Sequence, residues 1–190
     1  GLKRVLRTAL DRLTGKGGDP VLGLQTNFGG GKTHTMLALY HLARSDDLSR
    51  LEGVRELAAA MGIAGWKPAR TAVMISVFVG TAKGVDSSLL IDKGPKLRTL
   101  WGYIAWKLAG DPGLKIVREA EAAGTNPGWE LMVEVFRLAG PSVVLLDEVV
   151  AFARQLPDDR FEAFLSFIQS LTEAAKMVPN VLVVGSLPES

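Results

Sequence analysis

A glycine-rich run followed by a lysine and a threonine is the stretch whose residue types are best suited to chemistry. Residues 27–34 read Asn-Phe-Gly-Gly-Gly-Lys-Thr-His, and a short apolar run at residues 21–24 precedes them. Glycine lets successive backbone N–H groups converge on an anion, because it has no Cβ and adopts positive φ cheaply. A helix that starts near Lys32 would add its N-terminal N–H groups and the positive end of its dipole. The pattern therefore predicts a phosphate-binding loop.

Each position of this loop can be given a role in binding a nucleotide. Lys32 would reach the β- and γ-phosphates of ATP, and the Thr33 hydroxyl would bind Mg²⁺. The predicted nucleotide-binding residues are Asn27, Phe28, Gly29, Gly30, Gly31, Lys32, Thr33 and His34. The usual pattern, GxxxxGK[ST], has a glycine where this chain has Thr26, and Gly29 and Gly30 can supply the flexibility lost there. An ordinary strand-to-helix turn is the alternative interpretation.

Two adjacent carboxylates, Asp147 and Glu148, follow a run of four apolar residues at 143–146. Parallel strands of an open α/β sheet end at its ligand-facing edge, so Asp147 would lie beside the phosphate loop and hold Mg²⁺, mostly through water. Glu148 would orient or activate the water that attacks the γ-phosphate. A further apolar run at 181–185 ends at Ser186, which would lie near the γ-phosphate or be a plain strand-end residue.

Apolar periodicity predicts the helices and strands that position these residues. Helices are expected over residues 2–13, 33–43, 51–61, 97–108, 112–123, 127–138 and 161–171, with Gly110 ending the fourth. Asp111-Pro112 and Asn126-Pro127 each read as a helix cap followed by proline at the first helical position. The run at 71–79 is nearly unbroken in apolarity, which predicts a central strand of a parallel sheet. Residues 80–95 read as a long loop.

The first 19 residues form an amphipathic helix and a linker. Apolar residues recur at one-faced spacing, and the basic residues Lys3, Arg4, Arg7 and Arg12 are expected on the remaining faces. A solvated helix face is the preferred interpretation of these cations, and contact with nucleic acid is the alternative.

Composition predicts one folded domain over residues 1–190. The chain is 47% hydrophobic and 22% charged, with a formal net charge of only +2, so nothing marks it as a general polyanion binder. It has no cysteine and two histidines, which excludes disulfides, thiol catalysis and histidine metal clusters. No apolar run approaches the roughly 18 residues of a membrane span, and no signal-peptide layout opens the chain. We therefore expect a cytoplasmic protein with no membrane partner.

Several segments together resemble a known family. They are residues 27–42 (NFGGGKTHTMLALYHL), 98–102 (RTLWG), 145–148 (LLDE), 151–156 (AFARQL) and 186–188 (SLP). In combination they are similar to the bacterial and archaeal AAA-type ATPases classified as domain of unknown function 499. The likeness extends over almost the whole chain. Members of that family are much longer, so the sequence resembles their N-terminal ATPase core.

The resemblance implies a three-layer α/β P-loop NTPase of the ASCE type, with parallel strand order 1-4-3-2 and without the fifth strand and helical lid. By position, Lys32 and Thr33 match the nucleotide-site motif, Asp147 and Glu148 match Walker B, and Ser186 matches the sensor. The family context implies an ATP-driven machine for DNA-linked remodelling or genome defence. It also implies a ring-shaped homo-oligomer of the full-length protein and partners among DNA and DNA-modifying proteins.

The expected function is Mg²⁺-dependent ATP binding and hydrolysis, with Glu148, Lys32 and Ser186 as catalytic residues and Thr33 and Asp147 as metal ligands. ATP is preferred over GTP, because the chain lacks the asparagine-lysine-x-aspartate motif that reads guanine. Two alternatives stay open. One is a nucleotide-binding regulatory switch with little turnover, and the other is a DNA-binding module, whose affinity would fall steeply with salt.

Overall fold

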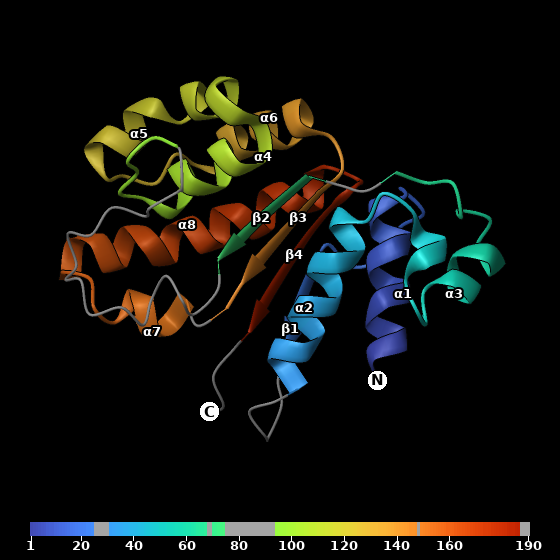
Figure 1. Cartoon of the computed structure of the whole chain (residues 1–190). Helices are drawn as coiled ribbons and strands as arrows, with labels where there is room; N and C mark the ends of the chain where they lie inside the picture. Colours follow the sequence, from blue (N-terminus) through green and yellow to red (C-terminus); the bar gives the residue numbers. More distant parts are fainter. Residues whose placement is uncertain (25–30, 68–69, 75–93, 148, 187–190) are drawn as a thin grey trace.

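The computed structural model describes residues 1–24, 31–67, 70–74, 94–147 and 149–186. The α-helices are α1 Leu2–Leu13, α2 Gly31–Arg44, α3 Arg55–Ala60, α4 Leu100–Ile116, α5 Arg118–Ala123, α6 Trp129–Ala139, α7 Val149–Ala153 and α8 Asp158–Met177. A 3₁₀ turn, η1, spans Leu48–Arg50. The strands are β1 Val21–Leu24, β2 Arg70–Met74, β3 Ser142–Leu146 and β4 Val181–Ser186. The chain is therefore an α/β protein, as predicted (Figure 1).

The strands form one parallel sheet with the order β1-β4-β3-β2. This is the predicted order. Parallel neighbours need a crossover connection, and helices provide it between successive strands. The carboxyl ends of the strands therefore lie at one edge of the sheet.

Helices cover both faces of the sheet, because side chains of a strand point alternately to either side. Val144 and Val183 pack with α4, α6 and α8, whereas Val143 and Leu182 pack with α1, α2 and α3. Figure 1 shows these two helix groups on opposite sides of the sheet. β3 is buried along its whole length. Its unbroken apolar run follows from this double cover.

The predicted central position of the strand that starts near Thr71 is wrong for the described part of the sheet. β2 pairs with β3 alone there, so it lies at an edge. Its sequence is apolar because α2 and α4 contact it, in the manner of an interior strand. The second half of the predicted strand, residues 75–79, lies outside the described residues.

Helix boundaries differ from the prediction at two places where a proline and a glycine lie close together in the sequence. The helix expected to stop at Gly110 does break there, with φ 63°, but a further segment containing Pro112 continues α4 to Ile116. α6 begins at Trp129, two residues beyond Pro127, because Gly128 has φ 88° and the Asn126 side chain accepts its N–H. Asn126 therefore caps the turn before α6.

Arg12 is buried, so its predicted place on an exposed face is wrong. Its side chain is 7% exposed. Nε donates to the Val181 carbonyl at 2.7 Å, and Nη2 donates to the carbonyls of Ala175 and Val178, each at 2.6 Å. The last two carbonyls belong to the C-terminal end of α8, where such oxygens lack intrahelical partners and a cation is favoured. Arg12 thus joins α1 to α8 and to the start of β4.

Lys3, Arg4 and Arg7 are exposed, as predicted. Within the part of the chain that the structure describes, no helix has both the length and the apolar character needed to cross a membrane.

Candidate functional site

The predicted phosphate loop connects the first strand to the second helix. β1 ends at Leu24, and α2 begins at Gly31. Lys32, Thr33 and His34 therefore occupy the first helical turn, as the sequence predicts. Asn27, Phe28, Gly29 and Gly30 lie outside the described residues.

The strand register brings three predicted site segments to one edge of the sheet. Leu24 of β1 pairs with Ser186 of β4. Leu146 of β3 pairs with Gly185, so Asp147 follows at the level of Ser186. The start of the phosphate loop, the strand end at Ser186 and the carboxylate Asp147 are therefore successive neighbours across three strands.

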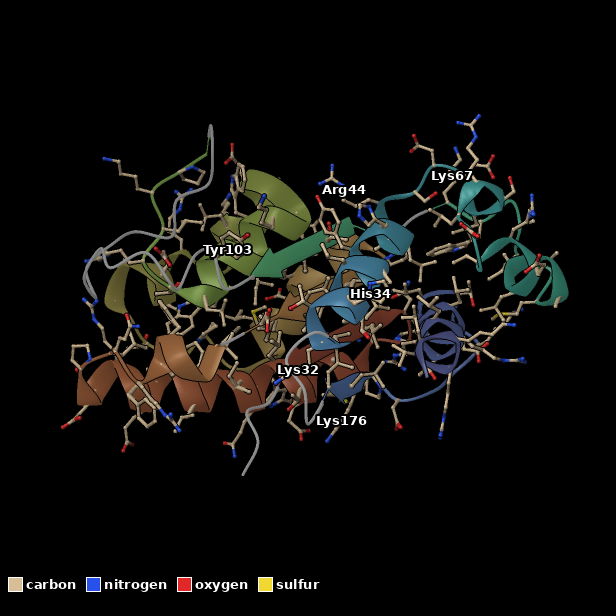
Figure 2. The ribbon with its side chains drawn as sticks, turned by 60° about the horizontal axis from the view of Figure 1, so that its bottom comes forward. Lys32, His34, Arg44, Lys67, Tyr103 and Lys176 are labelled. Carbon is tan, nitrogen blue, oxygen red and sulfur yellow. The ribbon has the colours of Figure 1, made fainter. Side chains whose placement is uncertain are left out.

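Side chains at this edge differ in exposure. Asp147 is only 8% exposed, Lys32 is half-buried, and Thr33 and His34 are exposed. Figure 2 shows Lys32 and His34 at one end of α2 and Arg44 at the other. No acidic residue lies in the first turn of α2. A helix start with a lysine and no acidic side chain favours an anion at that position.

The predicted catalytic carboxylate Glu148 lies outside the described residues, as does the side chain of Ser186. The backbone on either side of Glu148 is described, with Asp147 directly after β3 and α7 beginning at Val149. In the sequence, Glu148 is therefore one residue from a buried carboxylate and one residue from a short helix.

Two of the predicted site residues carry oxygen donors of the kind that Mg²⁺ binds. A hydroxyl at Thr33 and a carboxylate at Asp147 are the hard oxygen ligands that Mg²⁺ prefers, and it commonly completes its shell with water and phosphate. No group of three or more His, Asp or Glu side chains suited to a metal occurs among the described residues. His41 is exposed on α2, and its ring meets the Tyr40 ring edge-on with centroids 5.5 Å apart.

The sequence did not predict one contact, at the start of α4. The Glu121 carboxylate accepts hydrogen bonds from the backbone N–H groups of Arg98 at 2.6 Å and Thr99 at 3.1 Å, and from the Thr99 hydroxyl. The partners are more than twenty residues apart, so no local pattern indicates this contact. Gly102 permits it, because a Cβ there would lie 2.4 Å from Glu121 Oε2.

The family comparison covers the whole chain. The family model described as DUF499 N-terminal domain matches residues 1–190. No curated protein and no solved structure matches the chain. On the strength of a match over its full length, the chain belongs to the DUF499 family.

Proposed function

We propose that this chain binds and hydrolyses ATP with Mg²⁺ at the edge formed by Leu24, Ser186 and Asp147. The observation that best supports the proposal is the strand register, which aligns the start of the predicted phosphate loop with a buried carboxylate across one intervening strand. A glycine loop and a carboxylate far apart in the sequence become neighbours in this way. Chance strand-to-helix turns do not require that arrangement.

In the proposed site, Lys32 binds the β- and γ-phosphate oxygens as a point charge. The N–H groups at the start of α2 add donors and a favourable dipole. Thr33 and Asp147 would hold Mg²⁺, which would supply positive charge against that of the phosphates. Burial of Asp147 strengthens its interaction with a cation, because water screens the charges less.

Glu148 is proposed to orient the attacking water and accept its proton. Ser186, at the tip of the strand between the loop strand and the carboxylate strand, is proposed to contact the γ-phosphate. Both roles follow from the positions of these residues along the chain. Because both groups act on the chemical step, losing either should lower turnover more than it lowers nucleotide affinity.

The experiment compares Glu148→Gln with wild type in ATP affinity and phosphate release. We expect ATP affinity to stay within about twofold and turnover to fall by roughly 10²-fold or more, because the amide keeps the shape but cannot accept the proton. Glu130→Gln, at an exposed position of α6, serves as the matched control. Equal turnover in the Glu148→Gln and wild-type proteins would show that Glu148 is not the base.

The same experiment separates the alternatives. A regulatory switch would bind ATP tightly and release no phosphate in either protein. A DNA-binding module would retain duplex DNA with a steep dependence on salt and without need of ATP.

A further inference from the structure

The Thr35 side chain makes a hydrogen bond to the first residue of α2. Its hydroxyl donates to the Gly31 carbonyl at 2.9 Å. In an α-helix the backbone N–H of a residue donates to the carbonyl four positions earlier, which for Thr35 is the same Gly31 oxygen. Thr35 therefore holds this carbonyl with its side chain as well as with its backbone.

The first turn of α2 begins at a residue that disfavours a helix. Gly31 is the first helical residue, and glycine loses more backbone freedom on folding than any other residue. Lys32 places a positive charge at the positive end of the helix dipole, and no acidic side chain lies in this turn to offset it. Both features favour fraying of the turn. A second hydrogen bond to the Gly31 carbonyl opposes it.

The direction of the Gly31 carbonyl fixes the direction of the next N–H group. The peptide unit that joins Gly31 to Lys32 is planar, and in a trans peptide the C=O and the N–H point in opposite directions. The carbonyl, held by Thr35, points along the helix towards its C-terminal end. The Lys32 N–H therefore points out of the start of α2, towards the place where the proposed site binds phosphate.

We propose that Thr35 is a positioning residue of the phosphate loop. Its hydroxyl holds the peptide between Gly31 and Lys32 so that the Lys32 N–H donates to a phosphate oxygen of the bound nucleotide. The inference rests on the proposed ATPase function. The role differs from that of Thr33, because Thr35 acts through the backbone and touches neither the nucleotide nor Mg²⁺.

Thr8 makes the same kind of hydrogen bond in α1, so it provides a matched control. Its hydroxyl donates to the Arg4 carbonyl at 3.0 Å, and both threonines are half-buried. Threonine within a helix often bonds to the carbonyl four residues earlier, so such a bond alone does not indicate a function. Position distinguishes the two, because Gly31 is the last glycine of the predicted phosphate loop and Arg4 lies outside the proposed site.

The binding test compares Thr35→Val with Thr8→Val. Valine removes the hydroxyl but keeps the β-branched shape and a similar helix propensity. Equilibrium dialysis gives the Kd for ATP with Mg²⁺ in each protein. We expect affinity to be about fivefold weaker in Thr35→Val, the effect of losing one ordinary hydrogen bond, and unchanged in Thr8→Val.

A rescue variant separates the hydroxyl from the rest of the side chain. Thr35→Ser retains the donor and should bind ATP within about twofold of wild type. Urea unfolding shows whether stability alone explains the loss, because Thr35→Val and Thr8→Val each lose one bond of the same kind and should unfold at similar midpoints. Wild-type ATP affinity in Thr35→Val, or equally weak binding by Thr35→Ser and Thr35→Val, overturns the positioning role.

Amide hydrogen exchange without nucleotide tests the same hydroxyl independently. The N–H of residue 35 exchanges only when the first turn of α2 opens, so its protection should fall about fivefold in Thr35→Val. If wild type binds ATP and this protection is unchanged, the positioning role is overturned and the proposed function stands. If wild type does not bind ATP, the proposed function and the positioning role fail together.

Discussion

Replacing Arg12 with methionine should destabilise the fold more than the same replacement of any exposed basic residue of α1. Methionine retains an apolar stem but removes all three donor contacts, which bind carbonyl oxygens at 2.6–2.7 Å in a site where the side chain is 7% exposed. Each carbonyl left without a donor costs about 1 kcal/mol or more, and hydrogen bonds from a charged donor contribute about 1.5–3 kcal/mol each. Burial opposes this gain, since desolvation lowers the pKa of Arg12.

The net loss in the free energy of unfolding should be about 3 kcal/mol, a large share of the roughly 5–15 kcal/mol that stabilises a domain. Urea unfolding followed by circular dichroism measures it, with an unchanged m-value as the sign that only stability changed. Arg7→Met on the exposed face of α1 is the control and should shift stability by less than about 0.5 kcal/mol. If Arg12→Met and Arg7→Met unfold at the same urea concentration, the three contacts do not hold α1 to α8.

Two further predictions concern stability. Burial, with a smaller contribution from Tyr40, raises the pKa of Tyr103 to about 12 from 10.0. The free energy of unfolding that Tyr103 contributes is therefore fully present below pH 10 and is lost as the pH rises towards 12. Between about pH 9 and pH 11.5, the wild-type protein should lose about 2 kcal/mol more of this free energy than the Tyr103→Phe protein does. Urea unfolding at both pH values tests this, and equal losses in both proteins would contradict it. Gly113→Ala should destabilise by about 2 kcal/mol, since its Cβ would lie 2.4 Å from the Ala105 carbonyl oxygen. Gly65→Ala is the control, because a Cβ at that position meets open space. In thermal unfolding, the Tm of this control should be equal to or higher than that of wild type.

The strands could be predicted because the features that mark them lie within a few consecutive residues of the sequence. The apolar runs at 143–146 and 181–185 are bounded by polar or glycine residues, and their alternate side chains point to opposite helix layers. The start of α2 was equally readable, since the glycine-rich run that ends at Gly31 lies between the apolar run at 21–24 and the helical apolar spacing that follows Lys32. The strand order came from the family resemblance, and the structure confirms it.

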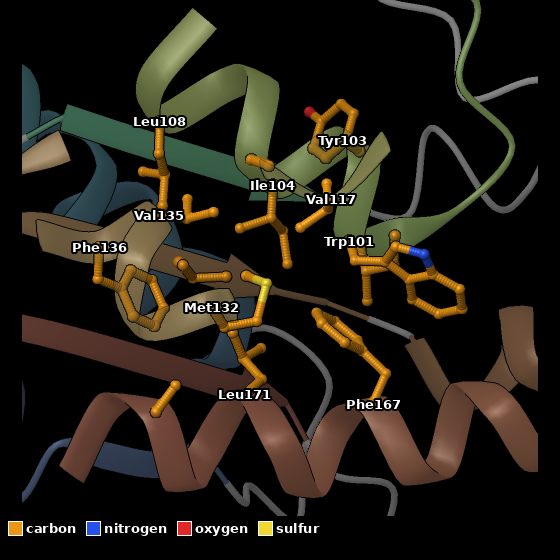
Figure 3. Close-up of a cluster of buried hydrophobic side chains, with 14 of the residues drawn as sticks. Trp101, Tyr103, Ile104, Leu108, Val117, Met132, Val135, Phe136, Phe167 and Leu171 are labelled. Atoms are coloured by element: carbon orange, nitrogen blue, oxygen red, sulfur yellow. The ribbon is translucent and has the colours of Figure 1, made fainter. Parts of the chain in front are cut away.

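Contacts between distant segments could not be predicted. Arg12 lies three residues after Ala9 and seven after Val5, on the apolar stripe of α1, and this spacing was the available sign that it is buried. Its partners, the carbonyls at the end of α8, are more than 160 positions away. The contact of Glu121 with Arg98 and Thr99 likewise depends on how α4 and α5 pack. Figure 3 shows the buried cluster in which α4 packs with α6 and α8. Helix propensity and periodicity contain no information on such packing.

A single binding measurement decides whether Lys32 lies in a nucleotide site. ATP affinity with Mg²⁺ is measured by equilibrium dialysis for wild type, Lys32→Ala and the control Lys176→Ala, an exposed lysine near the end of α8. Removing a cation that binds the phosphates directly should weaken ATP binding by roughly 30-fold or more, the equivalent of about 2 kcal/mol, while the control stays at the wild-type value. Unchanged ATP affinity in a correctly folded Lys32→Ala protein would contradict the proposed phosphate loop.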